Sequence, residues 1–207
     1  MERVNESSFI RVSTAIWKQS GPSAFEFATI DRTDGGHLLA GDIVVGDNND
    51  ALAIAYSIIV NSLWETENVQ ITTKEGTEAE RRIELLPDSD RRWSARRSKG
   101  GDWSRLPEYD GLIDIDLGCT PATNLLPIRR FNLGIGESAE TTAVWVMFPS
   151  LELEPLSQRY TRLSEREYLY ESFLSGFKAN LRVDEFGVVD RYSDIWTRLN
   201  AAPLSPP

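Results

Sequence analysis

The chain has 207 residues, 41% of them hydrophobic, and a formal net charge of −10, which is the balance of an ordinary soluble globular protein. That charge disfavours binding to nucleic acid or to an anionic membrane, because both need positive patches. A single histidine, His37, and a single cysteine, Cys119, exclude an intrachain disulfide and a metal cage of several His or Cys residues. A Ser-His-Asp or Cys-His catalytic site would depend on His37 alone, and its glycine-rich surroundings predict an exposed, inert side chain.

The chain carries no recognisable targeting signal. Its first 18 residues are charged and lack the apolar core of a secretory signal. The most apolar window, residues 51–60, is far shorter than the ~20 residues of a membrane helix. An unpartnered cysteine suits a reducing compartment. We therefore expect no transmembrane segment and a cytoplasmic location.

Apolar residues alternate with polar residues along most of the chain, which is the pattern of half-buried strands. The expected strands cover residues 25–29, 43–45, 52–64, 69–71, 83–86, the region of 93, 113–117, 141–148, 158–163, 168–173, 177–183 and 188–192. One short helix is expected at residues 195–199, capped by Ser193 or Asp194, and a disordered tail at 201–207. Regular short strands with turns between them predict an all-β barrel or curved sandwich in one domain, residues 1–200, although two half-barrels sharing a sheet would give the same pattern.

The most unusual segment is TPATNLLPIRR, residues 120–130. Two prolines fix the backbone and remove hydrogen-bond donors, so we expect a rigid crossing and not a strand within the sheet. If a strand resumes at Ile128, Arg129 and Arg130 point to opposite faces. An inward arginine needs an anionic partner. That partner is either a ligand phosphate, carboxylate or sugar hydroxyl, or, more commonly, a carboxylate such as Asp114 or Asp116.

Three other groups of side chains are candidates for function. Asp114 and Asp116 share one face of a strand, a spacing that suits acid–base catalysis but is equally typical of a half-solvated strand. Residues 81–105 hold eight basic and four acidic side chains, a charge pattern typical of a solvated hairpin at a sheet edge and also suited to an anionic partner. Six aromatic residues are candidates for the wall of a cavity or for core packing: Trp64, Trp93, Trp103, Trp145, Tyr168 and Tyr170.

The segment at 120–130 and its surroundings resemble the putative glycolipid-binding family, formerly a bacterial domain of unknown function. The matching residues are Asp114 to Leu117, TPATNLLPIRR, Gln158 to Tyr160 with Leu163, Tyr168, Tyr170, Gly187 to Val189, Tyr192, Trp196, Arg198 and Leu199. The resemblance implies an all-β fold of roughly fifteen strands in an open, curved, barrel-like sheet. The family name rests on a similarity of shape to bacterial lipid-carrier proteins.

These observations favour a non-catalytic protein that binds a glycolipid or another amphiphilic small molecule, with no cofactor and no metal. The expected fold is a many-stranded, curved antiparallel sheet forming an open or half-barrel, with one short C-terminal helix. Two alternatives are a hydrolase or isomerase that uses Asp114 and Asp116, and a protein-interaction module; the oligomeric state is left open. The expected ligand-binding residues are Arg129, Arg130, Asn124, Thr123 and Gln158 as polar anchors, with Trp64, Trp145 and Tyr168 as walls.

Overall fold

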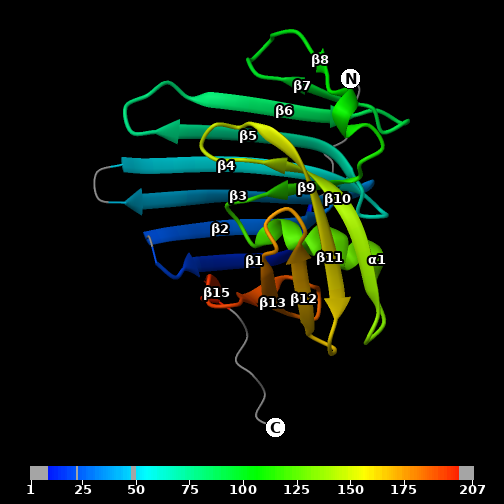
Figure 1. The fold of residues 1–207 in the computed structure, drawn as a ribbon. Helices are drawn as coiled ribbons and strands as arrows, with labels where there is room; N and C mark the ends of the chain where they lie inside the picture. The colour runs from blue at the N-terminus through cyan, green and yellow to red at the C-terminus, as the bar shows by residue number, and fades with distance from the viewer. Residues whose placement is uncertain (1–8, 22, 48–49, 201–207) are drawn as a thin grey trace, which may run out of the picture.

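The computed structural model describes residues 9–21, 23–47 and 50–200, and its main feature is one curved sheet of 15 strands (Figure 1). The first eight strands are β1 (Ile10–Gln19), β2 (Ser23–Arg32), β3 (Gly36–Asp47), β4 (Asp50–Asn61), β5 (Thr66–Glu75), β6 (Arg81–Pro87), β7 (Trp93–Arg96) and β8 (Ser104–Arg105). The other seven are β9 (Asp114–Leu117), β10 (Ser138–Val146), β11 (Leu153–Arg162), β12 (Glu167–Ser172), β13 (Lys178–Val183), β14 (Val189–Tyr192) and β15 (Trp196–Arg198). The helical segments are η1 (Pro107–Tyr109), η2 (Ala122–Asn124) and α1 (Leu125–Phe131).

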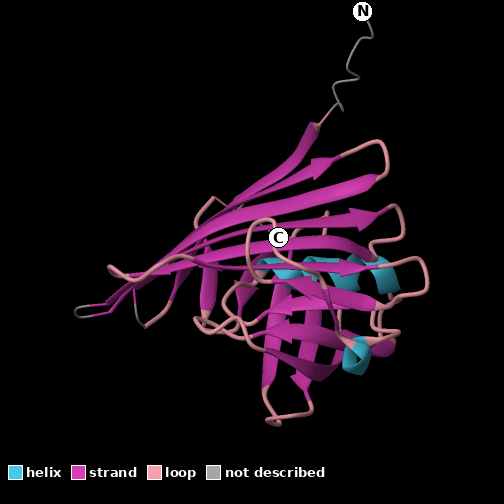
Figure 2. Cartoon of the chain, turned by 90° about the horizontal axis from the view of Figure 1, so that it is seen from above, coloured by secondary structure: helices cyan, strands magenta, loops and turns pink. Residues whose placement is uncertain are grey.

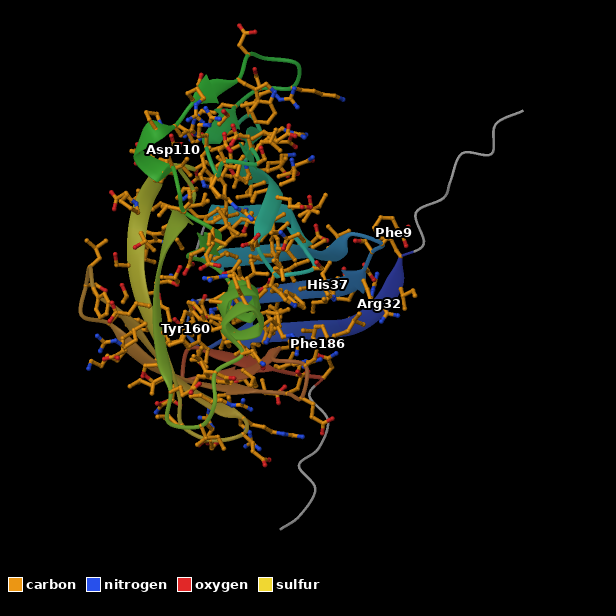
Figure 3. The ribbon with its side chains drawn as sticks, turned by 90° about the vertical axis from the view of Figure 1, so that its right-hand side faces the viewer. Phe9, Arg32, His37, Asp110, Tyr160 and Phe186 are labelled. Carbon is orange, nitrogen blue, oxygen red and sulfur yellow. The ribbon has the colours of Figure 1, made fainter. Side chains whose placement is uncertain are left out.

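The order of strands makes the sheet an open half-barrel. The sheet begins at β8, passes through β1 and β15 in its middle and ends at β9, so its two edges do not pair with each other. All neighbouring strands are antiparallel except β9 and β10. The sheet curves until its two wings face each other, and α1 lies between them (Figures 1 and 3). The predicted all-β, open, curved sheet is confirmed.

The core fills the concave side of this sheet. Trp17, Ile58, Ile71 and Leu85 on the inner face of one wing are fully buried. A second buried cluster, containing Tyr160, lies in the other wing and includes Ile128 of α1. The view from above in Figure 2 shows the longer helical segment, η2 with α1, enclosed between the strands. Most of the concavity is therefore filled by side chains.

The helix lies elsewhere than expected. The condition considered for Arg129 and Arg130, a strand that resumes at Ile128, is not met, because α1 covers Leu125–Phe131. Pro127 falls in the first turn, where its missing N–H has no helical acceptor, so the proline does not break the helix. Asn132 ends the helix in the left-handed conformation with φ 45°.

The predicted C-terminal helix at residues 195–199 is also wrong. Trp196–Arg198 forms β15, which pairs with both β14 and β1. A five-residue helix has little stability of its own, whereas β15 buries Trp196 and completes the middle of the sheet. The expected disordered tail at 201–207 lies outside the described residues.

Strand β9 is more deeply buried than the sequence pattern indicates. Asp114 is 1% exposed, and Ile115 and Leu117 on the opposite face belong to the main core. The interpretation of residues 113–117 as a half-solvated strand is therefore wrong. The reason is tertiary: α1 and its neighbours cover the aspartate side, which the local alternation does not reveal.

Candidate ligand-binding site

A cavity of 260 Å³, here called the Asp116 cavity, opens at the end of the concavity where α1 begins. Asp116 of β9 and Asn124 of η2 line it together with side chains from both wings of the sheet. A second space of 410 Å³, here called the apolar hollow, shares Gln19, Gly118, Trp145 and Trp196 with the cavity. It continues past Cys119, Met147 and Phe148. The Asp116 cavity and the apolar hollow are therefore neighbours, and Trp145 and Trp196 line both of them.

The polar part of the Asp116 cavity is a hydrogen-bonded network. The Gln158 amide donates to a carboxyl oxygen of Asp116. The Tyr160 hydroxyl donates to Asn124 Oδ1 at 3.0 Å, and the Asn124 amide donates to the carbonyl of Pro121. Burial raises the pKa of Asp116 to about 6, because no cation compensates its charge within the described residues. Asp116 is thus a carboxyl group that changes its charge near neutral pH while facing a cavity.

A fully buried acid, Glu26, lies directly behind the cavity wall. Glu26 is 1% exposed and accepts a hydrogen bond of 2.6 Å from Tyr56. Thr120, which lines the cavity, has its hydroxyl 2.6 and 2.8 Å from the two Glu26 oxygens. Burial raises the pKa of Glu26 to about 7. Gly41 makes this arrangement possible, since a Cβ atom there would lie 2.6 Å from the Tyr56 ring.

The opposite wall of the Asp116 cavity is aromatic and apolar. Trp145 packs against the backbone of Gly118, where an added Cβ would lie 2.5 Å from the indole nitrogen. Trp196 and Tyr170 contribute further ring surface. Leu174 is 62% exposed and Phe177 38% exposed, and both line the cavity on the β12–β13 side. The cavity therefore has one hydrogen-bonding side and one apolar side.

Asp114 does not share the environment of Asp116. Its carboxylate pairs with the Arg130 guanidinium, with Arg130 Nε 3.1 Å from Oδ1, and accepts a hydrogen bond of 2.6 Å from Thr141. This confirms the prediction of a buried arginine–aspartate pair. Asp114 is committed to that pair, so only Asp116 of the two aspartates lines the cavity.

Arg129 lies at the other end of α1, on the wall of a separate cavity of 390 Å³ that we call the Arg129 cavity. Its guanidinium lies 4.7 Å from the ring centroid of Phe186 and 5.3 Å from that of Trp64. Trp64 in turn stacks on His37 at 4.1 Å. The prediction that His37 is exposed is wrong, because this stacking half-buries it.

The eight residues predicted to bind ligand are divided among three environments. Asn124 and Trp145 line the Asp116 cavity, and Gln158 holds the carboxyl group of Asp116. Arg129 and Tyr168 line the Arg129 cavity, with Trp64 stacked beside Arg129. Thr123 accepts a backbone hydrogen bond from Leu117, and Arg130 binds Asp114.

The basic segment 81–105 forms β6, β7 and β8 at one edge of the sheet. Its arginines are extensively paired with acids or with carbonyl groups. Arg96 pairs with Glu84, Arg105 with Asp110, and Arg97 donates to the carbonyl of Leu151. The local excess of positive charge is thereby reduced.

Sequence reasoning missed Glu26, Thr120 and Tyr192 as neighbours of the site. Glu26 lies between Phe25 and Phe27, and alternation alone favours burial of the phenylalanines. The structure reverses this: Phe25 is 41% and Phe27 46% exposed. The burial of Glu26 can be inferred only from the neighbouring strands. Gly41 of β3 lies opposite Tyr56 of β4, and the missing side chain at Gly41 leaves room for the Tyr56 ring, whose hydroxyl binds Glu26.

Fold and cavities together define an all-β protein in which one open, curved sheet encloses a short helix and leaves pockets at both helix ends. The family model described as putative glycolipid-binding matches residues 14–198, and the chain belongs to this family. The crystal structure of a DUF1089 family protein from Pseudomonas aeruginosa is 32% identical, with a TM-score of 0.74 over 87% of this chain and 95% of that one. No curated protein matches. Within the described residues, no helix is long and apolar enough to cross a membrane.

Proposed function

We propose that the protein binds a sugar-bearing amphiphile, such as a glycolipid, without transforming it chemically. The sugar occupies the Asp116 cavity and the alkyl chain occupies the apolar hollow. The observation that carries this proposal is Asp116 itself, a half-buried carboxyl group without a cationic partner among the described residues, facing a cavity with aromatic walls.

The polar side of the cavity supports recognition of hydroxyl groups. A carboxylate accepts hydrogen bonds from neighbouring hydroxyls, and such charge-assisted bonds are the stronger ones. Gln158 already fixes the orientation of the Asp116 carboxyl group, so little rearrangement is needed on binding. An uncompensated carboxylate also disfavours an anionic group at this position.

The apolar side supports an aliphatic or ring surface. Trp145 and Trp196 line both spaces, so one ligand can place a sugar against their rings and extend a chain past Phe148. The 410 Å³ of the apolar hollow lies within the ~300–1,000 Å³ typical of small-molecule sites. Family membership agrees with a ligand of this kind.

The test is direct binding of a minimal amphiphile. The protein is titrated with n-octyl β-glucoside below its critical micelle concentration, and with methyl β-glucoside and n-octanol as half-ligands. We expect octyl glucoside to bind more tightly than either half. Native mass spectrometry of gently purified protein should also reveal a copurifying amphiphile, which extraction with organic solvent removes.

Substitution distinguishes the cavity from other surfaces. Asp116→Ala should weaken octyl glucoside binding about tenfold or more, the loss of one charge-assisted hydrogen bond. Asp42→Ala, which removes an exposed carboxylate from β3, is the matched control and should leave affinity unchanged. An apo mass together with no saturable binding across a panel of glycolipids and lipids would refute the proposal.

We further propose a cytoplasmic location, supported by the unpaired Cys119, whose thiol pKa is raised by burial. Fractionation of cells expressing the untagged chain tests this location. Recovery of the protein in an extracytoplasmic fraction would contradict it.

A further inference from the structure

The Arg129 cavity is separate from the site of the proposed function. The two cavities share no lining residue. Tyr168 and Tyr170, two positions apart on the inner face of β12, each line one of them. In Figure 3, Phe186 and His37 lie on one side of α1 and Tyr160 on the other. A ligand in the Arg129 cavity can therefore bind independently of one in the Asp116 cavity.

Arg129 is held in place by aromatic rings and not by an acid. Among the described residues, no carboxylate lies within ion-pairing distance of its guanidinium. Its neighbours Phe186 and Trp64 lie 4.7 and 5.3 Å away by ring centroid. Contact with ring faces orients a guanidinium but leaves its N–H groups free to donate. Arg129 is thus an oriented donor fork at the edge of a cavity.

The acids around the Arg129 cavity are largely occupied. Asp184 binds Arg198 at 2.7 Å through one oxygen and accepts the N–H groups of Phe186 and Val188 through the other. Glu185 pairs with Arg166. Glu165 is exposed at the surface. The charge of Arg129 is consequently not neutralised by the carboxylates that share its cavity.

Tyr168 supplies a second donor. Its side chain is 4% exposed and lines the cavity, and no residue in the described part of the chain bonds to its hydroxyl group. Among the described residues the fully buried polar side-chain atoms without a partner are His37 Nδ1 and Thr66 Oγ1, so the Tyr168 hydroxyl oxygen is accessible from the cavity and free to donate to a ligand. Nearby, Arg162 is already bound to the carbonyl groups of Leu133 and Glu165.

We propose that the Arg129 cavity binds a phosphate monoester, with the Arg129 guanidinium and the Tyr168 hydroxyl as donors to its oxygens. The planar donor fork of arginine matches the geometry of a phosphate group. A space of 390 Å³ exceeds the needs of the phosphate group alone, so the cavity also accommodates the group that the phosphate carries. That group belongs either to a soluble metabolite or to a lipid headgroup.

His37 provides a built-in reporter for this binding. It is the only histidine in the chain, so its imidazole gives one set of NMR signals. Burial is the main cause that lowers the pKa of His37, and the positive charges of Arg129 and Arg32 lower it further. An anion on Arg129 offsets one of those charges. Bound phosphate is therefore expected to raise the His37 pKa.

The experiment follows the His37 signal of the full chain during titration with methyl phosphate, with sodium chloride at equal ionic strength as the reference. We expect a saturable change and an upward shift of the His37 pKa. Dihexanoyl phosphatidic acid below its critical micelle concentration forms the second arm. Tighter binding of the lipid identifies a headgroup as the source, and equal binding identifies a soluble phosphate monoester.

Variants separate the site from general charge effects. Arg129→Gln should weaken methyl phosphate binding about 10- to 100-fold and remove the response of His37, and Tyr168→Phe should weaken binding with the fold retained. Arg92→Gln removes the same charge at the sheet edge and should have no effect. Asp116→Ala should also leave phosphate binding intact. No saturable response, or an equal response in Arg129→Gln, would overturn the proposal.

Discussion

The hydroxyl oxygen of Thr120 lies 2.6 and 2.8 Å from the two carboxyl oxygens of Glu26, joining a residue on the cavity wall to an acid buried in the main sheet. Thr120 begins the TPATNLLPIRR segment, and Glu26 lies on the inner face of β2. The contact therefore fixes the start of the helical segment against the sheet. Its strength depends on the charge of Glu26, which burial makes sensitive to pH near neutrality.

Glu26 is expected to make the protein less stable as pH rises from about 4.5 to about 7. Its pKa is about 7 in the folded protein and near 4.5 when unfolded, so the folded state binds the proton more tightly. The contribution is absent below about pH 4.5 and grows to a destabilisation of ~3 kcal/mol above about pH 7. Glu26→Gln should remove it in urea unfolding measured across this window. Glu80→Gln, at an exposed position, is the control; parallel profiles for wild type and Glu26→Gln would contradict the expectation.

Gly41 is expected to tolerate no side chain. A Cβ atom would lie 2.6 Å from the Tyr56 ring, so Gly41→Ala should displace the ring and cost about 1–3 kcal/mol of unfolding free energy. Gly46→Ala on the same strand is the control, since a Cβ there meets nothing within 4 Å. Combining Gly41→Ala with Tyr56→Leu should cost less than the sum of the two single changes. Strict additivity would show that the two residues do not interact.

The ligand affinity of the Asp116 cavity is expected to depend on pH. Asp116 has a pKa of about 6, and its ionised form accepts hydrogen bonds from hydroxyl groups more strongly. Binding of octyl glucoside, measured by calorimetry, should therefore tighten as pH rises from about 5 to about 7.5. Asp116→Asn should bind with little dependence on pH. A wild-type profile that is equally flat would exclude the carboxylate as the acceptor.

The periodicity of the sequence predicted the sheet well because it depends on local alternation. Residues 52–60, for example, alternate as expected within β4. The helix could not be located in this way. Prolines at 121 and 127 indicate an interrupted strand, yet a proline in a first turn is compatible with a helix. Whether such a segment becomes helical depends on the space inside the curved sheet.

The candidate site was predictable only in part. An arginine–aspartate pair follows from the general rule that buried charges are paired, and Arg130 with Asp114 conforms to it. The separation of Arg129 from Arg130 was expected from a strand, in which neighbouring side chains point to opposite faces, and the helix separates them as well. The depth of Glu26 and Asp116 depends on which faces α1 and the opposite wing cover, and this information is not local.

Removing one partner of the buried Arg130–Asp114 pair is expected to destabilise the protein more than removing both. Arg130→Met leaves Asp114, 1% exposed, without its cation and should cost about 3–5 kcal/mol. Adding Asp114→Leu should restore much of that loss, because the uncompensated charge is gone. Arg191→Met breaks an exposed pair with Asp194 and should cost less than about 1 kcal/mol. Denaturant unfolding measures all three; equal costs for the two arginine variants would contradict the argument.

Gly118 is expected to control the shape of the Asp116 cavity through Trp145. A Cβ atom at position 118 would lie 2.5 Å from the indole nitrogen, so Gly118→Ala must push the ring away from the strand. Because Trp145 lines both the cavity and the apolar hollow, the displaced ring should lower octyl glucoside affinity about tenfold and change the tryptophan fluorescence spectrum. Gly46→Ala again serves as the control, with neither effect. Unchanged affinity in a Gly118→Ala variant whose fluorescence has changed would place the bound ligand elsewhere, since Trp145 would then have moved without consequence for binding.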